Sequence, residues 1–123
     1  MAYTLEWETK GVYWEYSGTI SGKEIIEAST KIYGDPRFDS LRYKLVDFSA
    51  AEEVLISEDE IKLITFQHAA ASKSNARIKN AIVLTKDDER GKLYAGYLVK
   101  SSPWEVRIFD HLEEANNWVG RLI

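Results

Sequence analysis

Cysteine is absent from this 123-residue chain, which excludes a disulfide, a thiolate metal site and a cysteine nucleophile. Basic residues are not in excess, because 16 Lys and Arg against 20 Asp and Glu give a net charge of −4, and this argues against nucleic-acid binding. No run approaches the ~18 apolar residues of a membrane span. Residues 1–10 alternate polar and apolar residues, unlike a signal peptide. We therefore expect a cytoplasmic protein without a membrane span.

Motifs for metal binding and catalysis are also missing. His68 and His111 are the only histidines, which excludes a histidine-rich zinc site, and the carboxylates have no recognisable ligand spacing. The sequence has no nucleophile–base–orienter pattern, no GxSxG and no glycine-rich phosphate loop. We expect no metal, no cofactor and no enzymatic activity.

The N-terminal part of the chain has the pattern of a β-hairpin followed by a helix. Residues 3–8 and 12–20 alternate between apolar and polar side chains, which predicts two half-buried strands. Ser21 and Glu24 have the spacing of a capping box, and the helix that they begin is predicted to end at Gly34.

The rest of the chain alternates strand patterns with helix patterns. Strands are predicted at residues 43–48, 80–85 and 104–109, and helices at residues 57–75, at 87–101 and after Asp110. Asp110 and Glu113 again have capping-box spacing. Strands separated by helices imply right-handed crossovers and a mostly parallel sheet. We predict one α/β domain over residues 1–123, with a mostly parallel five-stranded sheet, an antiparallel N-terminal hairpin strand and four helices.

The last strand indicates that the two faces of this sheet differ. Trp104, Val106 and Ile108 lie on one side of it, and Glu105 and Arg107 lie on the other. A strand covered on both faces has a continuous apolar run instead. We infer that the helices lie chiefly on one face, with the other face partly exposed to water or covered by a partner. The alternative is that the alternating strands are edge strands with one solvated face.

Two segments and the order of the elements carry a family resemblance. The segments are GDPRFDSLRYKLVDFS at residues 34–49 and PWEVRIFDHLEEANNWV at residues 103–119. A Pro-Arg-Phe after the first helix, a strand ending in aspartate, and a last strand followed by an acidic-started helix resemble the STAS domain and the neighbouring SpoIIAA-like family. The resemblance covers nearly the whole chain. It implies an α/β fold with strands in near-sequential order, and a relation to CRAL-TRIO lipid-transfer domains implies an apolar ligand.

Ser57 is the position at which this resemblance implies a regulatory serine. Anti-sigma-factor antagonists of this fold carry Asp-Ser-Ser-Gly at the start of the second helix, and a gapless alignment from Asp47 puts the phosphorylated serine at Ser57. Leu55 and Ile56 replace the Asp-Ser, and Glu58 replaces the glycine, so the chain departs from the switch pattern. The residue pattern itself predicts that Ser57 is a helix N-cap worth ~1 kcal/mol.

An apolar site is predicted from side chains of the second and third helices. His68 lies at an inward-facing helical position, and Tyr94 and Tyr97 lie at the margin of an apolar stripe. Together with Phe66 they are candidates to edge a ligand pocket or an oligomer contact. The alternative is that they are ordinary core residues. Asp47 is expected to order the loop after its strand by bonding backbone amides.

Three functions remain open at the level of sequence. The first is a non-enzymatic regulatory domain that binds a protein partner or forms a homodimer. The second is a binder of a small apolar, lipid-like ligand between the second and third helices. The third is an anti-sigma-factor antagonist switched by phosphorylation of Ser57.

Overall fold

The sheet of the computed structural model, which describes residues 3–84 and 88–121, has five strands in the order β1-β2-β3-β4-β5. The strands are β1 (Tyr3–Trp7), β2 (Gly11–Ser21), β3 (Tyr43–Leu55), β4 (Lys79–Val83) and β5 (Glu105–Phe109). The helices are α1 (Gly22–Tyr33), α2 (Glu58–Ser72), α3 (Glu89–Ser101) and α4 (Leu112–Val119), with a 3₁₀ turn η1 (Pro36–Ser40). β1 pairs antiparallel with β2, and the other strand pairs are parallel. The predicted fold class is confirmed.

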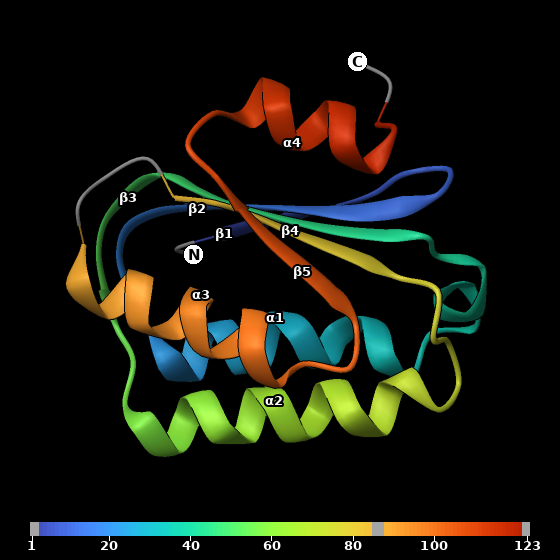
Figure 1. Ribbon diagram of the computed structural model, residues 1–123, viewed down its shortest axis with the longest axis horizontal. Helices are drawn as coiled ribbons and strands as arrows, with labels where there is room; N and C mark the ends of the chain where they lie inside the picture. The colour runs from blue at the N-terminus through green and yellow to red at the C-terminus, as the bar shows by residue number, and fades with distance from the viewer. Residues whose placement is uncertain (1–2, 85–87, 122–123) are drawn as a thin grey trace.

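Helices α1, α2 and α3 cover one face of the sheet, and α4 lies on the other (Figure 1). The larger core fills the space between the sheet and the three helices, where Trp14, Phe48 and Ile64 are buried. A smaller core lies under α4, around Leu45 and Ala115. α4 packs on β3, β4 and β5, so the β1–β2 part of its face carries exposed side chains. The predicted asymmetry of the sheet is therefore confirmed.

The helix starts were predicted correctly where a capping box forms, and wrongly at α4. Ser21 and Ser57 are the N-caps of α1 and α2, each with both hydrogen bonds of the box. The predicted cap at Asp110 is wrong, since the N-cap of α4 is His111, without a side-chain cap bond. The helix begins one residue later, so Glu113 falls at its second position and cannot close a capping box.

The predicted loop after Asp47 is also wrong, because β3 continues to Leu55. This second half pairs with the second half of β2, with register shifts between Glu15 and Ser17 and between Gly18 and Thr19. The shifts are β-bulges, which break the strict alternation that identifies a strand in a sequence. Asp47 lies inside β3 and is its last residue paired with β4.

β4 is buried on both faces, as its continuous apolar run predicts, and its residues 80–83 are buried. The predicted strand end at residue 85 and helix start at residue 87 lie outside the described residues. α3 has Asp88 as its N-cap, and the Oδ2 atom of Asp88 accepts a hydrogen bond of 2.9 Å from the backbone N–H of Val54. This bond ties the start of α3 to the end of β3. None of the described helices is both long and apolar enough to cross a membrane.

Candidate functional site

Lys44 is a buried amine in the larger core. Side chains alternate along a strand, so Lys44 of β3 points toward α1–α3 while Tyr43 and Leu45 point toward α4. Lys44 is only 2% exposed. Within residues 3–84 and 88–121, no ion pair joins its ammonium group to a carboxylate. A buried ammonium without a counter-ion is costly, so the groups around it decide its chemistry.

Aromatic rings and two neutral acceptors surround the amine. Its Nζ lies 3.2 Å from the Tyr33 hydroxyl oxygen and 3.5 Å from His68 Nε2. The centroids of the Trp14, Tyr33 and Trp104 rings lie 5.5, 5.4 and 5.0 Å from the same nitrogen. Cation–π contacts of this kind replace part of the hydration of an ammonium group. Trp14 lies on β2 and Tyr33 on α1, whereas His68 lies on α2 and Trp104 directly precedes β5.

His68 is held as a neutral acceptor. Its Nδ1 lies 2.9 Å from Ser102 Oγ, and this oxygen accepts a 3.2 Å hydrogen bond from the backbone N–H of Trp104. Burial, assisted by the charge of Lys44, lowers the pKa of His68 far below its usual range. When Nε2 accepts a hydrogen bond from Lys44, Nδ1 carries the ring hydrogen and donates a hydrogen bond to Ser102 Oγ. His68 therefore orients the amine without adding a positive charge.

Burial lowers the pKa of Lys44 to about 7, so much of the amine is uncharged near neutral pH. An uncharged lysine amine is a nucleophile. Asn80 lies beside Lys44 on β4, in direct register with it, and is almost fully buried. The Oδ1 atom of Asn80 has no hydrogen-bond partner. The interior next to the amine thus contains an unused acceptor.

A hollow of about 270 Å³ opens on the surface beside this cluster. It lies between the end of α1, η1 and the C-terminal half of α2, and its lining consists of Tyr33, Phe38, Gln67, Ala70, Ala71 and Ser74. Tyr33 lines the hollow and also bonds Lys44, so its side chain separates the hollow from the amine. The Oε1 atom of Gln67 is buried without a hydrogen-bond partner.

The four residues of the predicted apolar site have different surroundings in the structure. Phe66 is 72% exposed on the outer side of α2, whereas His68 points inward to Lys44. Tyr94 is buried with its ring at right angles to Phe48, the centroids 5.9 Å apart. Tyr97 packs against the larger core. None of the four lines the hollow beside Tyr33.

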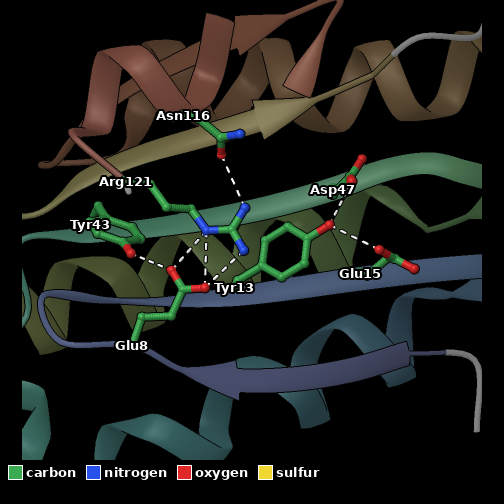
Figure 2. A network of polar contacts seen from close by, with 7 residues as sticks. All are labelled: Glu8, Tyr13, Glu15, Tyr43, Asp47, Asn116 and Arg121. Carbon is green, nitrogen blue, oxygen red and sulfur yellow. Dashed lines mark hydrogen bonds and ion pairs between the residues drawn. The ribbon is translucent and has the colours of Figure 1, made fainter. Parts of the chain in front are cut away.

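A second polar cluster lies on the α4 face of the sheet (Figure 2). Arg121, just after α4, donates from Nε and Nη2 to Glu8 at 2.8 Å each and from Nη1 to Asn116 at 3.1 Å. The Tyr43 hydroxyl also donates to Glu8. Burial opposes ionisation of Glu8, but the bonds from Arg121 and Tyr43 hold its pKa below the usual value. This ion pair ties the end of α4 to the β1–β2 turn.

Tyr13 extends the same cluster to Asp47. Its ring stacks under the Arg121 guanidinium at 4.0 Å, and its hydroxyl donates to Asp47 Oδ2 at 2.9 Å, with Glu15 Oε2 3.0 Å away (Figure 2). Burial and the two carboxylates raise the pKa of Tyr13, which keeps it protonated. Asp47 Oδ1 accepts a 2.9 Å bond from the backbone N–H of Ser49. Asp47 thus bonds a backbone amide within β3, and the loop that it was expected to order is part of this strand.

The two clusters differ in what they leave unsatisfied. A hollow of about 450 Å³ lies beside Glu8 and Tyr43, but Glu8 is already neutralised by Arg121, so this cluster acts as a structural clamp. Within the described part of the chain, Lys44 has no such ion pair. Two acceptor atoms in this region, Asn80 Oδ1 and Gln67 Oε1, have no hydrogen-bond partner. In the described residues, no group of three or more His, Cys, Asp or Glu side chains is placed to hold a metal ion. We therefore take the Lys44 cluster and its hollow as the candidate site.

Sequence reasoning missed Lys44, although a signal for it exists. Within the predicted strand at residues 43–48, Lys44 alternates with Tyr43 and Leu45 and shares a face with Val46 and Phe48. A lysine on the apolar face of a central strand is rare, because lysine is almost never fully buried unless it is paired.

Ser57 is exposed at the start of α2. Its Oγ accepts a 3.2 Å hydrogen bond from the backbone N–H of Glu60, and Glu60 Oε1 accepts one of 2.9 Å from the backbone N–H of Ser57. The predicted N-cap is confirmed. Glu58, Asp59 and Glu60 occupy the first turn next to it.

Solved structures, but not sequences, place the chain among known proteins. No protein-family model matches it, and no curated protein matches it. The anti-sigma factor antagonist SpoIIAA in its unphosphorylated form matches with a TM-score of 0.63 and 15% identity, over 99% of this chain and 100% of that one. SpoIIAA from Bacillus in its phosphorylated form matches with a TM-score of 0.60 and 16% identity, over 96% and 99% of the two chains. An uncharacterized protein from Shewanella loihica PV-4 with a SpoIIAA-like fold has a TM-score of 0.60 and 12% identity, over 96% and 92%. The chain therefore has a SpoIIAA-like fold.

Proposed function

We propose that this protein is a non-enzymatic, cytoplasmic regulatory domain that binds a protein partner, or a second copy of itself, through the outer side of α2. The observation that carries this proposal is the exposure of Phe66, at 72%, next to Leu63, at 46%. Residues three apart on a helix are neighbours on its surface, so the two side chains form one apolar patch. The matched SpoIIAA structure in its unphosphorylated form is named an anti-sigma factor antagonist, which supports a role in binding another protein.

The direction of Phe66 supports a contact with a partner. Ile61, Ile64 and His68 are the buried residues of α2, and Phe66 projects from the opposite side of the helix. Burying a Phe side chain contributes about 1.5–3 kcal/mol, and aromatic anchors at the centre of an interface supply a large share of binding energy. An exposed Phe66 adds nothing comparable to the stability of the monomer.

Substituting Phe66 tests this proposal. Phe66→Ser is expected to leave the melting temperature unchanged and to abolish self-association in sedimentation velocity. In a separate variant, a photoreactive residue at position 66 is expected to cross-link to the bound partner or second copy. Leu93→Ser, at a residue of α3 that is 59% exposed, is the matched control and is expected to change neither result. A wild-type protein that stays monomeric, together with a photoreactive variant that forms no cross-link from position 66, would overturn the proposal.

A second candidate function is the binding of a small apolar ligand. It is favoured by the hollow beside Tyr33 and Phe38, whose walls include Ala70 and Ala71. This hollow lies between α1, η1 and α2, whereas the sequence suggests a pocket between the second and third helices. We propose the hollow as the location of the ligand. Titration with benzyl alcohol is expected to change tryptophan emission, because the Trp104 ring lies 6.3 Å from Phe38. Unchanged emission and melting temperature would remove this candidate.

A third candidate function is a phosphorylation switch at Ser57, favoured by its exposure and by the match to a phosphorylated SpoIIAA. The three acidic residues after it repel an added phosphate. Incubation with a serine kinase of the anti-sigma type tests it, and an unchanged mass would exclude it.

A further inference from the structure

We propose that Lys44 is a covalent attachment site, whose amine condenses with a small apolar aldehyde that enters through the hollow between α1, η1 and α2. This inference rests on the apolar-ligand function proposed above and names the chemistry of that ligand. It concerns ligand capture and requires no turnover.

The position of Tyr33 connects the hollow to the amine. Its hydroxyl oxygen lies 3.2 Å from Lys44 Nζ, while its ring forms part of the wall of the hollow. Tyr33 is the last residue of α1. At the following Gly34, no atom lies within 4 Å of the position that a Cβ atom would take. The Phe38 ring packs edge-on against Tyr33 with centroids 5.5 Å apart. The proposal requires that a rotation of the Tyr33 side chain, which lies between the hollow and Nζ, opens a path to the amine.

The unused polar atoms favour an aldehyde over an anion. Gln67 is a lining residue of the hollow, and Asn80 lies beside Lys44 on the neighbouring strand. The Oε1 atom of Gln67 and the Oδ1 atom of Asn80 are buried acceptors without a hydrogen-bond partner. A carboxylate has only acceptor oxygens and gains no bond from either atom. The hydroxyl group of the carbinolamine, formed when an amine adds to an aldehyde, is a donor and satisfies one of them. The aromatic and alanine walls match the apolar remainder of such a ligand.

The reaction balances without another reactant. The lone pair of the neutral Lys44 amine attacks the carbonyl carbon, a C–N bond forms, and a proton moves from nitrogen to oxygen to give the carbinolamine. Loss of water breaks the C–O bond, and both original amine hydrogens leave with that oxygen as the C=N bond forms. His68 Nε2 and the Tyr33 hydroxyl lie 3.5 and 3.2 Å from Nζ, where they accept hydrogen bonds from the amine and orient its lone pair. An uncharged lysine in a desolvated pocket is the usual nucleophile of such imines.

Reductive trapping tests the proposal on the whole protein. Benzaldehyde and sodium cyanoborohydride at pH 7.4 are expected to give a benzyl adduct that peptide mass spectrometry maps to Lys44, with at least a tenfold preference over the exposed Lys62 of α2. Lys44→Met is expected to lose this adduct and to retain its circular dichroism spectrum. Adducts spread over surface lysines, with Lys44 unmodified, would overturn the inference.

Variants of the hollow test the route. Ala70→Trp fills the hollow from an exposed position and is expected to slow labelling of Lys44 at least tenfold, with labelling of Lys62 unchanged. Ala69→Trp is the matched control, because Ala69 is exposed on the same helix but does not line the hollow. Equal labelling in both variants would refute entry through the hollow.

Benzyl alcohol separates this inference from the function on which it rests. It has nearly the shape of benzaldehyde but no electrophilic carbonyl group, so it can bind without forming an imine. If benzyl alcohol binds and benzaldehyde leaves no adduct, the apolar-ligand function stands and the covalent step is wrong. If neither binds, both are wrong. An adduct at Lys44 that benzyl alcohol competes away supports both.

Discussion

Replacement of Lys44 by methionine is expected to remove a specific pH dependence of stability. In the folded protein burial lowers the pKa of Lys44 from 10.5 to about 7. Between these two values the unfolded chain holds a proton that the folded protein lacks, so the free energy of unfolding rises with pH. The stabilisation grows as the pH rises above about 7 and is complete above the unfolded pKa.

The size of the effect follows from the same shift. Each pH unit within this window is worth ~1.4 kcal/mol, and allowing for partial protonation at its lower end, the free energy of unfolding rises by about 2 kcal/mol between pH 7 and pH 9. The titratable groups that face Lys44 do not interfere. Burial raises the pKa of Tyr33 above this range and lowers that of His68 below it. Lys44 is wholly buried, so solvent does not screen the effect.

Urea unfolding at several pH values between 7 and 9 measures this slope. The wild-type protein is expected to gain about 2 kcal/mol more over this range than Lys44→Met. Methionine preserves the apolar stem without the amine, so the variant is expected to fold. Lys62→Met is the control, because Lys62 is exposed, and its profile should follow the wild type. Parallel profiles for the wild type and Lys44→Met would refute the reasoning.

Three further predictions concern the scaffold. Ser57→Ala is expected to lower the free energy of unfolding by ~1 kcal/mol through loss of the N-cap, with Ser57→Asp retaining most of it; equal melting temperatures for all three proteins would contradict this. Gly11→Ala is expected to cost ~3 kcal/mol or more, because the added methyl group meets the Tyr43 ring, whereas Gly34→Ala meets no atom and should be nearly neutral in urea unfolding. A double-mutant cycle of Glu8→Gln and Arg121→Gln is expected to give a coupling energy of about 2 kcal/mol, since the pair is largely buried; additive effects would show that the pair contributes nothing.

Elements that depend on local signals could be predicted from the sequence. The capping boxes at Ser21 and Ser57 consist of residues three apart, so their hydrogen bonds need no tertiary information. The burial of β4 on both faces followed from its continuous apolar run. The second half of β3 could not be predicted, because its bulges shift Ala51 and Val54 out of alternation and polar residues separate them.

The candidate site lies beyond prediction because residues distant in sequence assemble it. Tyr33, His68 and Trp104 surround Lys44 from three separate elements, and no spacing in the chain indicates that they meet. The helical pattern predicts that His68 faces inward, but it does not indicate that His68 meets Lys44. The shift in the pKa of Lys44 arises from burial by these elements, so it exists only in the folded protein.

Strand β3 places one polar cluster on each face of the sheet, and the two differ in a way that bears on function. Tyr43 and Asp47 point to the α4 face, where Glu8 is matched by Arg121. Lys44 points to the other face without a carboxylate, at a position where methionine would fill the same space at no cost in desolvation. A residue that weakens the core in the absence of a ligand is a departure from the otherwise consistent pattern of this sequence. Such departures concentrate at functional sites, which is the physical reason to test the amine of Lys44 first.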